Sequence, residues 1–279
     1  MPAERIAENL AFINWTVLTG LSVGAFAAVV LARLRTDATR GFLVFTAACA
    51  GLLGLLALAS DMTLPGTLTG PPIAADAAWE TPRRAALVAF CGLAFVGVVL
   101  LARRSQAAIP IGLAGMTAGA AVLAFGALGW GGGLLTAVPL LVQLGVLTAA
   151  TGGVFAAMIL GHWYLVTPKL SERPLILFAR ALTVILALQV ALFIVWVATG
   201  AGPAATAPFA VLVGPWALFV WLRLLVGLVF PLIVSWAAVQ TARSRSMESA
   251  TGLLYINVGS IAAGTILAAG LYFGAGVLV

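Results

Sequence analysis

Eight stretches of this chain are apolar over a length that can cross a bilayer as a helix, and this constrains its fold more than any other feature. A hydrocarbon core needs about 20 consecutive apolar residues in a helix. The stretches run approximately over residues 11–32, 41–60, 85–102, 107–128, 134–161, 175–199, 210–239 and 250–277. The short alternating segments of a membrane barrel do not occur. The sequence therefore predicts an all-α polytopic membrane protein with eight transmembrane helices, in which residues 1–279 form one membrane domain.

Composition excludes the soluble classes of function. Of the 279 residues, 63% are apolar and only 8% are charged, against roughly 25% charged residues in an average soluble domain. A water-soluble domain with this composition would have too little polar surface to cover its core. The net charge of +6 is therefore read by loop rather than as a nucleic-acid-binding face. We expect the lipid bilayer as a partner and no nucleic acid.

The basic residues alternate between the two sides of the predicted bundle. One side carries Arg33, Arg35, Arg40, Arg103, Arg104, Lys169, Arg173, Arg243 and Arg245, and the other carries Arg5, Arg83 and Arg84. Loops rich in Lys and Arg stay in the cytoplasm. The pattern predicts a bacterial-type cytoplasmic (inner) membrane protein whose N-terminus and C-terminus both lie on the non-cytoplasmic side.

A few polar side chains remain inside the predicted helices and form the first candidate site. An arginine at a helix centre costs about 2.5–3.5 kcal/mol on insertion scales, so intramembrane ionisable residues are candidates for function. The outer half of the bundle holds Arg223 with Asn14, Gln189 and Gln143. These side chains can converge on one polar pocket in the outer half of the bundle.

A second polar group lies toward the cytoplasmic side, and it includes the single histidine. Its members are His162, Tyr164, Arg180, Tyr255 and Asn257. One histidine cannot form a bis-histidine haem site, and no set of metal-binding side chains is clustered. We therefore expect no metal and no covalently bound cofactor. His162 is interpreted as a residue of the interfacial belt, beside Trp163 and Tyr164.

Glycine and proline mark three special places in the predicted helices. Gly152 and Gly153 fall in the middle of the fifth segment, where they permit either close helix packing or a break at a transport site. Pro231 is expected to kink the seventh segment. Ser260 and Gly264 form a small-xxx-small pair in the eighth. The longest loop, from Asp61 to Arg84, also holds Asp76 and Glu80.

The first segment resembles the opening helix of the NrfD-like subunits of the polysulfide-reductase type. The resemblance covers Asn14 to Phe26, a polar and Trp-containing start followed by Gly20-Leu21-Ser22-Val23-Gly24-Ala25. It implies eight helices without a cofactor of their own, a quinol bound near the outer face and an iron–sulfur subunit docked outside. It also implies Asn14 as a donor to the quinone. Sites of that family usually include a membrane carboxylate or histidine, whereas Asp61, Asp76 and Glu80 are expected here in loops.

Three functions remain open at this point, and whether the chain is an enzyme is open as well. The first is a non-haem subunit of a respiratory or redox membrane complex that binds a quinone or similar lipophile and contacts other membrane subunits. In this function Arg223 and Asn14 would donate to a quinone carbonyl, with Gln189 and Gln143 as second donors. Trp15 and Trp216 would pack on the ring or belong to the interfacial belt. The second is a small-solute or lipid transporter that uses a break at Gly152-Gly153. The third is a scaffold or assembly subunit whose polar residues only fix helix packing.

Overall fold

The computed structural model describes residues 1–65, 73, 75–167 and 170–279, and its described part is built from helices. Eight of these helices are long and apolar enough to cross a membrane, which confirms the all-α prediction and is consistent with a polytopic membrane protein. The helices are α1 (Pro2–Glu8), α2 (Leu10–Arg35), α3 (Arg40–Met62), α4 (Glu80–Ala102), α5 (Ala108–Trp130), α6 (Leu134–Val166), α7 (Arg173–Thr199), α8 (Ala217–Leu224), α9 (Phe230–Arg243) and α10 (Met247–Ala275). Two 3₁₀ turns, η1 (Ala77–Trp79) and η2 (Ala210–Leu212), and a π-helical turn, η3 (Leu225–Val229), complete the described elements.

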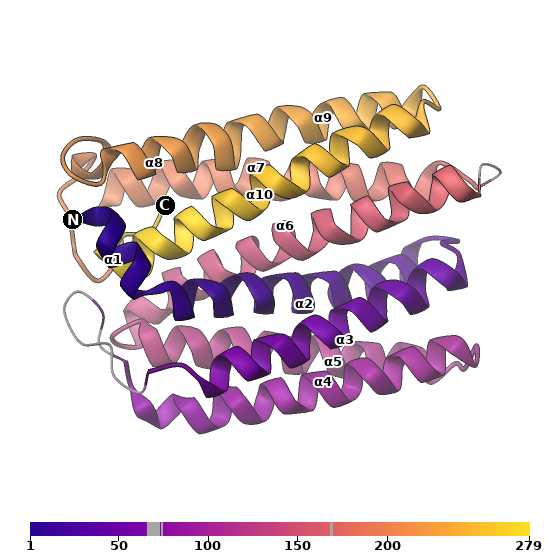
Figure 1. The fold of residues 1–279 in the computed structure, drawn as a ribbon, viewed down its shortest axis with the longest axis horizontal. Coiled ribbons are helices and arrows are strands. Elements are labelled where there is room, and N and C mark those ends of the chain that lie inside the picture. The colour runs from indigo at the N-terminus through magenta and orange to yellow at the C-terminus, as the bar shows by residue number, and fades with distance from the viewer. Residues whose placement is uncertain (66–72, 74, 168–169) are drawn as a thin grey trace.

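Both chain ends lie at one end of the bundle (Figure 1). We call this the terminal end, and the opposite end, where α2 turns into α3 and α4 into α5, the basic end. Arg33, Arg40 and Arg104 lie at the basic end. The alternation of basic loops therefore coincides with the two ends of the bundle. Assignment of the basic end to the cytoplasm stays a prediction from the positive-inside rule.

The long helices form two groups of four that lie side by side (Figure 1). The first group contains α2 to α5 and the second contains α6, α7, α10 and the bent helix made of α8, η3 and α9. Helix α2 joins the groups because it packs on both α6 and α10 as well as on α3 and α5. It is accordingly the most enclosed span, with 61% of its apolar window buried against 28% for α7.

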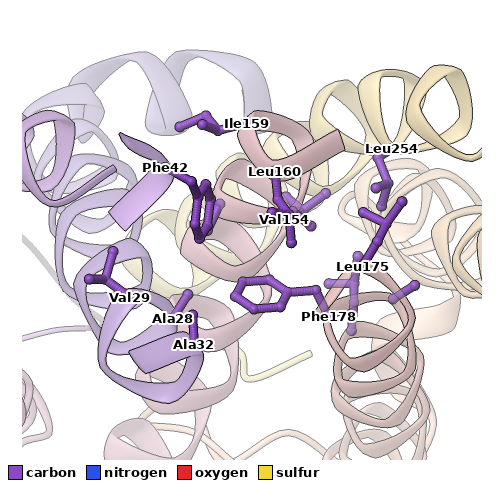
Figure 2. Close-up of a cluster of buried hydrophobic side chains, with 14 of the residues drawn as sticks. Ala28, Val29, Ala32, Phe42, Val154, Ile159, Leu160, Leu175, Phe178 and Leu254 are labelled. Carbon is purple, nitrogen blue, oxygen red and sulfur yellow. The ribbon is translucent and has the colours of Figure 1, made fainter. Parts of the chain in front are cut away.

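Apolar side chains from both groups meet in a core on the basic side of the bundle (Figure 2). The rings of Phe42 and Phe178 contact edge to face, with centroids 6.2 Å apart. Val154 and Leu160 of α6 lie between them and the α10 residue Leu254. Because lipid tails are as apolar as these side chains, packing contacts rather than water exclusion hold such a core together.

The two groups of helices touch most closely where α2 crosses α6 at glycines. A Cβ on Gly152 would overlap the backbone nitrogen of Ala25, and a Cβ on Gly24 would overlap the carbonyl oxygen of Thr148. Only glycine permits this approach of two backbones. Helix α6 continues without interruption through Gly152 and Gly153 to Val166. Of the two interpretations of these glycines, the break is therefore contradicted, and close packing of α6 on α2 is found at Gly152 but not at Gly153, where a Cβ would meet nothing within 4 Å.

The seventh span differs from its prediction in where it begins and in where it is irregular. The predicted segment 210–239 begins as a helix only at Ala217, because the preceding residues form the short turn η2. Its irregularity lies before Pro231 as a π-helical turn, η3, rather than as a simple kink at the proline. Proline has no N–H to donate to the carbonyl one turn earlier, so the helix before it is free to widen.

Candidate functional site

Arg223 and Gln189 meet in the interior, as the sequence predicted for this part of the site. Arg223 is 2% exposed, and its Nη2 donates to Gln189 Oε1 at 2.6 Å. Its Nη1 donates to the carbonyl oxygen of Gly227 at 3.2 Å. This is the carbonyl that Pro231 leaves without its usual helical donor. We call Arg223, Gln189 and Gly227 the Arg223 cluster.

Close packing of α10 on η3 seals the Arg223 cluster. A Cβ on Gly227 would lie 2.5 Å from the Cα of Gly264, and one on Gly264 would lie 2.9 Å from Arg223 Nη1. Gly264 is half of the predicted small-xxx-small pair, and here it makes room for a guanidinium as well as for a backbone. Nε of Arg223 has no hydrogen-bond partner among the described residues. The cluster is therefore well suited to fixing three helices and is not open to a ligand.

Gln143 lies near this cluster but serves a different contact. Its Nε2 donates to the carbonyl oxygen of Val279 at 2.6 Å, and its Oε1 accepts from Trp196 Nε1 at 3.2 Å. Gln189 Nε2 donates to the carbonyl of Val146, one turn further along α6. The two glutamines thus tie α6 to α7 and to the last residues of the chain. Neither amide faces Asn14.

Asn14 stands apart from the other three predicted donors. It is exposed on α2, and its Nδ2 donates to Ser60 Oγ of α3 at 3.2 Å. The expectation that all four polar side chains would share one pocket is therefore wrong. Helix neighbours explain the separation, because Asn14 faces α3 whereas Gln189 and Arg223 meet at the contact of α7 with α8.

An ion-pair cluster that the sequence reasoning missed lies beside Asn14 at the terminal end. Asp61 is fully buried, and its Oδ1 accepts from Arg83 Nε at 2.7 Å. Its Oδ2 accepts from Arg84 Nε at 3.2 Å, and Arg84 also pairs with Glu80 at 2.8 Å.

Helix α3 extends to Met62 and α4 begins at Glu80. Asp61 and Glu80 therefore belong to helices, contrary to their prediction as loop residues, and only Asp76 stays outside a helix.

Aromatic rings enclose the Arg83 guanidinium. Its Cζ lies 4.6 Å from the ring centroid of Trp130 and 5.8 Å from that of Trp15. Such cation–π contacts are worth about 2 kcal/mol when they are desolvated. Trp15 is fully buried, so it belongs to the core rather than to an interfacial belt, and its Nε1 has no partner among the described residues. We call Asp61, Arg83, Arg84, Trp15 and Trp130 the Asp61 cluster.

The sequence itself carries one signal for the Asp61 cluster. Asp61 ends one apolar segment and Arg83-Arg84 begin the next, so opposite charges are expected at the same end of two consecutive helices. Unpaired, each of these buried charges would cost several kcal/mol. The pairing therefore allows Asp61, near the end of α3, and Arg83, near the start of α4, to be buried.

The second predicted group does not converge on one place either. Tyr255 Oη and His162 Nδ1 lie 3.3 Å apart, and both side chains are exposed. Tyr164 Oη donates to the carbonyl of Ser171, and Arg180 is exposed on α7. Asn257 is fully buried and donates to Ser235 Oγ at 2.7 Å and to the Pro231 carbonyl at 3.2 Å. Only His162 and Tyr255 form a pair, while Asn257 steadies α9 just after its proline.

An apolar cavity of about 270 Å³ opens between α2, α5, α6 and α7. Its lining includes Gly24, Met116, Gly153 and Phe178. No charged side chain lines it. Such a surface accepts an acyl or isoprenoid chain but cannot recognise a polar head group.

Among the described residues, no group of three or more His, Cys, Asp or Glu side chains is placed to hold a metal ion.

In the Arg223 cluster, removing one partner of the hydrogen bond should lower the unfolding free energy more than removing both partners. Gln189→Leu leaves the buried guanidinium without its side-chain acceptor and should cost about 1–3 kcal/mol of unfolding free energy. Adding Arg223→Met removes the buried charge, and we expect it to recover most of that loss. Thermal unfolding of both variants in the same detergent measures the difference. A double variant less stable than Gln189→Leu would show that Arg223 stabilises the fold through other contacts.

Comparisons of this chain with family models, with curated proteins and with solved structures find no match. The resemblance of the first span to NrfD-like subunits therefore stays a hypothesis that depends on Asn14 to Phe26. Inferences about function depend on the chemistry of the two clusters and on the cavities.

Proposed function

We propose that this chain is a membrane-embedded, non-haem subunit of a respiratory or redox complex, and that it binds a quinone or a similar lipophile at the Asp61 cluster. The observation that carries the proposal is the exposed Asn14 amide beside the fully buried Asp61 carboxylate and its arginine partners. The location differs from the one expected from sequence, since Arg223 and the glutamines are occupied by each other and by backbone carbonyls.

The donor set at the Asp61 cluster suits a quinone head group. A quinone presents two carbonyl oxygens, which need N–H or O–H donors. Asn14 Nδ2 is exposed beside Ser60, whereas the unpartnered Nε1 of Trp15 lies inside the cluster and faces another side of α2. A buried polar atom without a partner costs about 1–3 kcal/mol, which a ligand acceptor would offset. Asp61 supplies the carboxylate that the NrfD-like resemblance leads one to expect near the quinone.

Other subunits remain part of the proposal. The terminal end holds the Asp61 cluster, and it is the end at which the resemblance implies an iron–sulfur partner. Exposed apolar residues such as Trp221 and Trp236 lie along the spans and are available to lipid or to neighbouring membrane subunits. The transporter alternative has lost its main support, because α6 is continuous through Gly152. The scaffold alternative draws support from the sealed Arg223 cluster.

Identification of bound lipophiles tests the proposal. The full chain is purified in mild detergent, and co-purifying subunits and lipophiles are identified by mass spectrometry. We expect a quinone, and we expect Asn14→Leu to lower its occupancy roughly two- to tenfold, the effect of one lost hydrogen bond. Gln240→Leu is the matched control, because it removes an exposed amide at the basic end of α9.

Two results would contradict the proposal. Purified chain that carries neither a lipophile nor a partner subunit would favour the scaffold alternative. Bound quinone whose occupancy is the same in Asn14→Leu and Gln240→Leu would place the lipophile elsewhere, for example in the apolar cavity beside Phe178.

A further inference from the structure

Three arginines surround a cavity at the basic end of the bundle. The cavity has a volume of about 230 Å³ and lies where α2 turns into α3 and α4 turns into α5 (Figure 1). Arg33 comes from the end of α2, Arg40 from the start of α3 and Arg104 from the turn after α4. Ser105 adds a hydroxyl to the same lining. All three arginine side chains are exposed, so a ligand can reach them.

These arginines have no acidic partner in the described part of the chain. No described carboxylate lies within 4.0 Å of the guanidinium nitrogens of Arg33, Arg40 or Arg104. The one acidic residue of the α2–α3 turn, Asp37, is exposed and does not line the cavity. Three positive charges that share one cavity repel one another unless an anion lies between them. The cavity is therefore complementary to an anionic group.

Arg104 adopts a backbone conformation that favours glycine, as Arg245 does at the end of α9. Arg104 has φ +56°, and it follows α4 in the left-handed position that usually belongs to glycine. The N–H of Ser105 donates to the carbonyl of Leu100 and that of Arg104 to the carbonyl of Leu101, as in a helix-ending glycine motif. A side chain in this conformation is strained, and strain of this kind is common at ligand sites. Glycine would therefore suit the backbone at this position better than arginine does.

An apolar groove continues from the arginine cavity toward the middle of the bundle. The two share Arg33, Leu101 and Ala108, and the groove adds Phe26 and Gly112. With a volume of about 20 Å³ the groove cannot enclose an acyl chain. It presents an apolar face against which a chain in the surrounding bilayer can lie. Charge at the rim with apolar surface directly below it matches the form of a phospholipid.

We infer that this cavity is a binding site for the phosphate head group of an anionic phospholipid. Arginine guanidinium groups bind phosphate oxygens through paired N–H donors, and basic pockets between transmembrane helices recognise anionic lipid head groups. The site is separate from the Asp61 cluster, since it lies at the opposite end of the same helices. The arginines that are expected to orient the chain in the membrane thus also form the lipid-binding pocket.

Lipid titration of the full chain tests the site. The protein in a neutral detergent is titrated with phosphatidylglycerol or with zwitterionic phosphatidylcholine, and bound lipid is counted by native mass spectrometry. We expect selective binding of phosphatidylglycerol, with affinity reduced roughly fivefold by loss of one arginine in Arg40→Gln or Arg104→Gln. Arg103→Gln is the matched control, because Arg103 is the exposed neighbour of Arg104 and does not line the cavity.

A further variant separates binding from folding. Arg104→Gly places glycine at a left-handed position, so its thermal midpoint should be at least that of the wild type while its lipid affinity falls like that of Arg104→Gln. Equal affinity losses in Arg103→Gln and Arg104→Gln, or equal binding of the two lipids, would overturn the proposal. Displacement of the lipid by inorganic phosphate at similar concentration would also overturn it and would identify a site for the free anion.

Discussion

Alanine in place of Gly152 is expected to destabilise this protein strongly, although it adds only one methyl group. The new Cβ would overlap the backbone of Gly24 and Ala25, and backbone atoms cannot rotate away as a side chain does. Helices α2 and α6 would have to separate at the contact that joins the two groups of helices. We expect a loss of at least about 3 kcal/mol, at the upper end for overpacked cores. This corresponds to a thermal midpoint lowered by roughly 6–12 °C.

The adjacent glycine provides the control for this experiment. A Cβ on Gly153 meets nothing within 4 Å, so Gly153→Ala changes the same helix by the same group without overlap. Unfolding can be followed with a thiol-reactive dye, because Cys91 is buried in α4 until the bundle opens. A Gly152→Ala protein as stable as Gly153→Ala would contradict the close crossing of α2 and α6.

Asp61→Asn is expected to lower the free energy of unfolding by a similar amount, because it removes a buried charge rather than adding volume. The substitution keeps the shape of the side chain but leaves Arg83, only 4% exposed, without its carboxylate. Breaking a buried ion pair by removing one partner costs about 3–5 kcal/mol. Arg84 loses one of its two acceptors at the same time. We expect a lower thermal midpoint in detergent together with looser attachment of α4 to α3.

Glu80→Gln is the matched control for the Asp61 cluster. Glu80 also pairs with Arg84, but its side chain is 38% exposed. An exposed pair one helical turn apart contributes only about 0.3–0.5 kcal/mol. Adding Arg83→Met to Asp61→Asn should restore at least half of the lost stability, since it removes the uncompensated buried charge. Equal effects of Asp61→Asn and Glu80→Gln would show that the Asp61 carboxylate is solvated rather than buried.

Local sequence predicted each of the eight spans but not the partners of their polar side chains, and it did not predict the short helix α1. Gln189 and Arg223 were expected to be near one another because both lie in the same half of their spans, and the packing of α7 on η3 and α9 brings them together. Asn14 lies at a similar depth, yet it faces α3. Depth follows from position along a helix at 1.5 Å per residue. The direction that a side chain faces depends on which helices are neighbours.

The Asp61 cluster shows where the segment boundaries themselves limited the prediction. Apolar composition places the end of a span at the first charged residues, which assigned Asp61 and Glu80 to a loop. A paired charge can remain inside a helix, because its partner supplies the interactions that water would otherwise provide. The candidate site at the terminal end therefore became visible only when Asp61, Arg83 and Trp15 were placed together.

Amino-acid sequence alone determined that this protein is a bundle of eight apolar helices with its basic loops at one end. That information is local, because hydrophobic length and loop charge are properties of short segments. Tertiary structure decided that Gly152 packs against Gly24 and does not break a helix, and that Asp61 is buried with Arg83 beside Asn14. It also decided that Arg33, Arg40 and Arg104 share one cavity. These features arise from contacts between helices distant in sequence, which no single segment encodes.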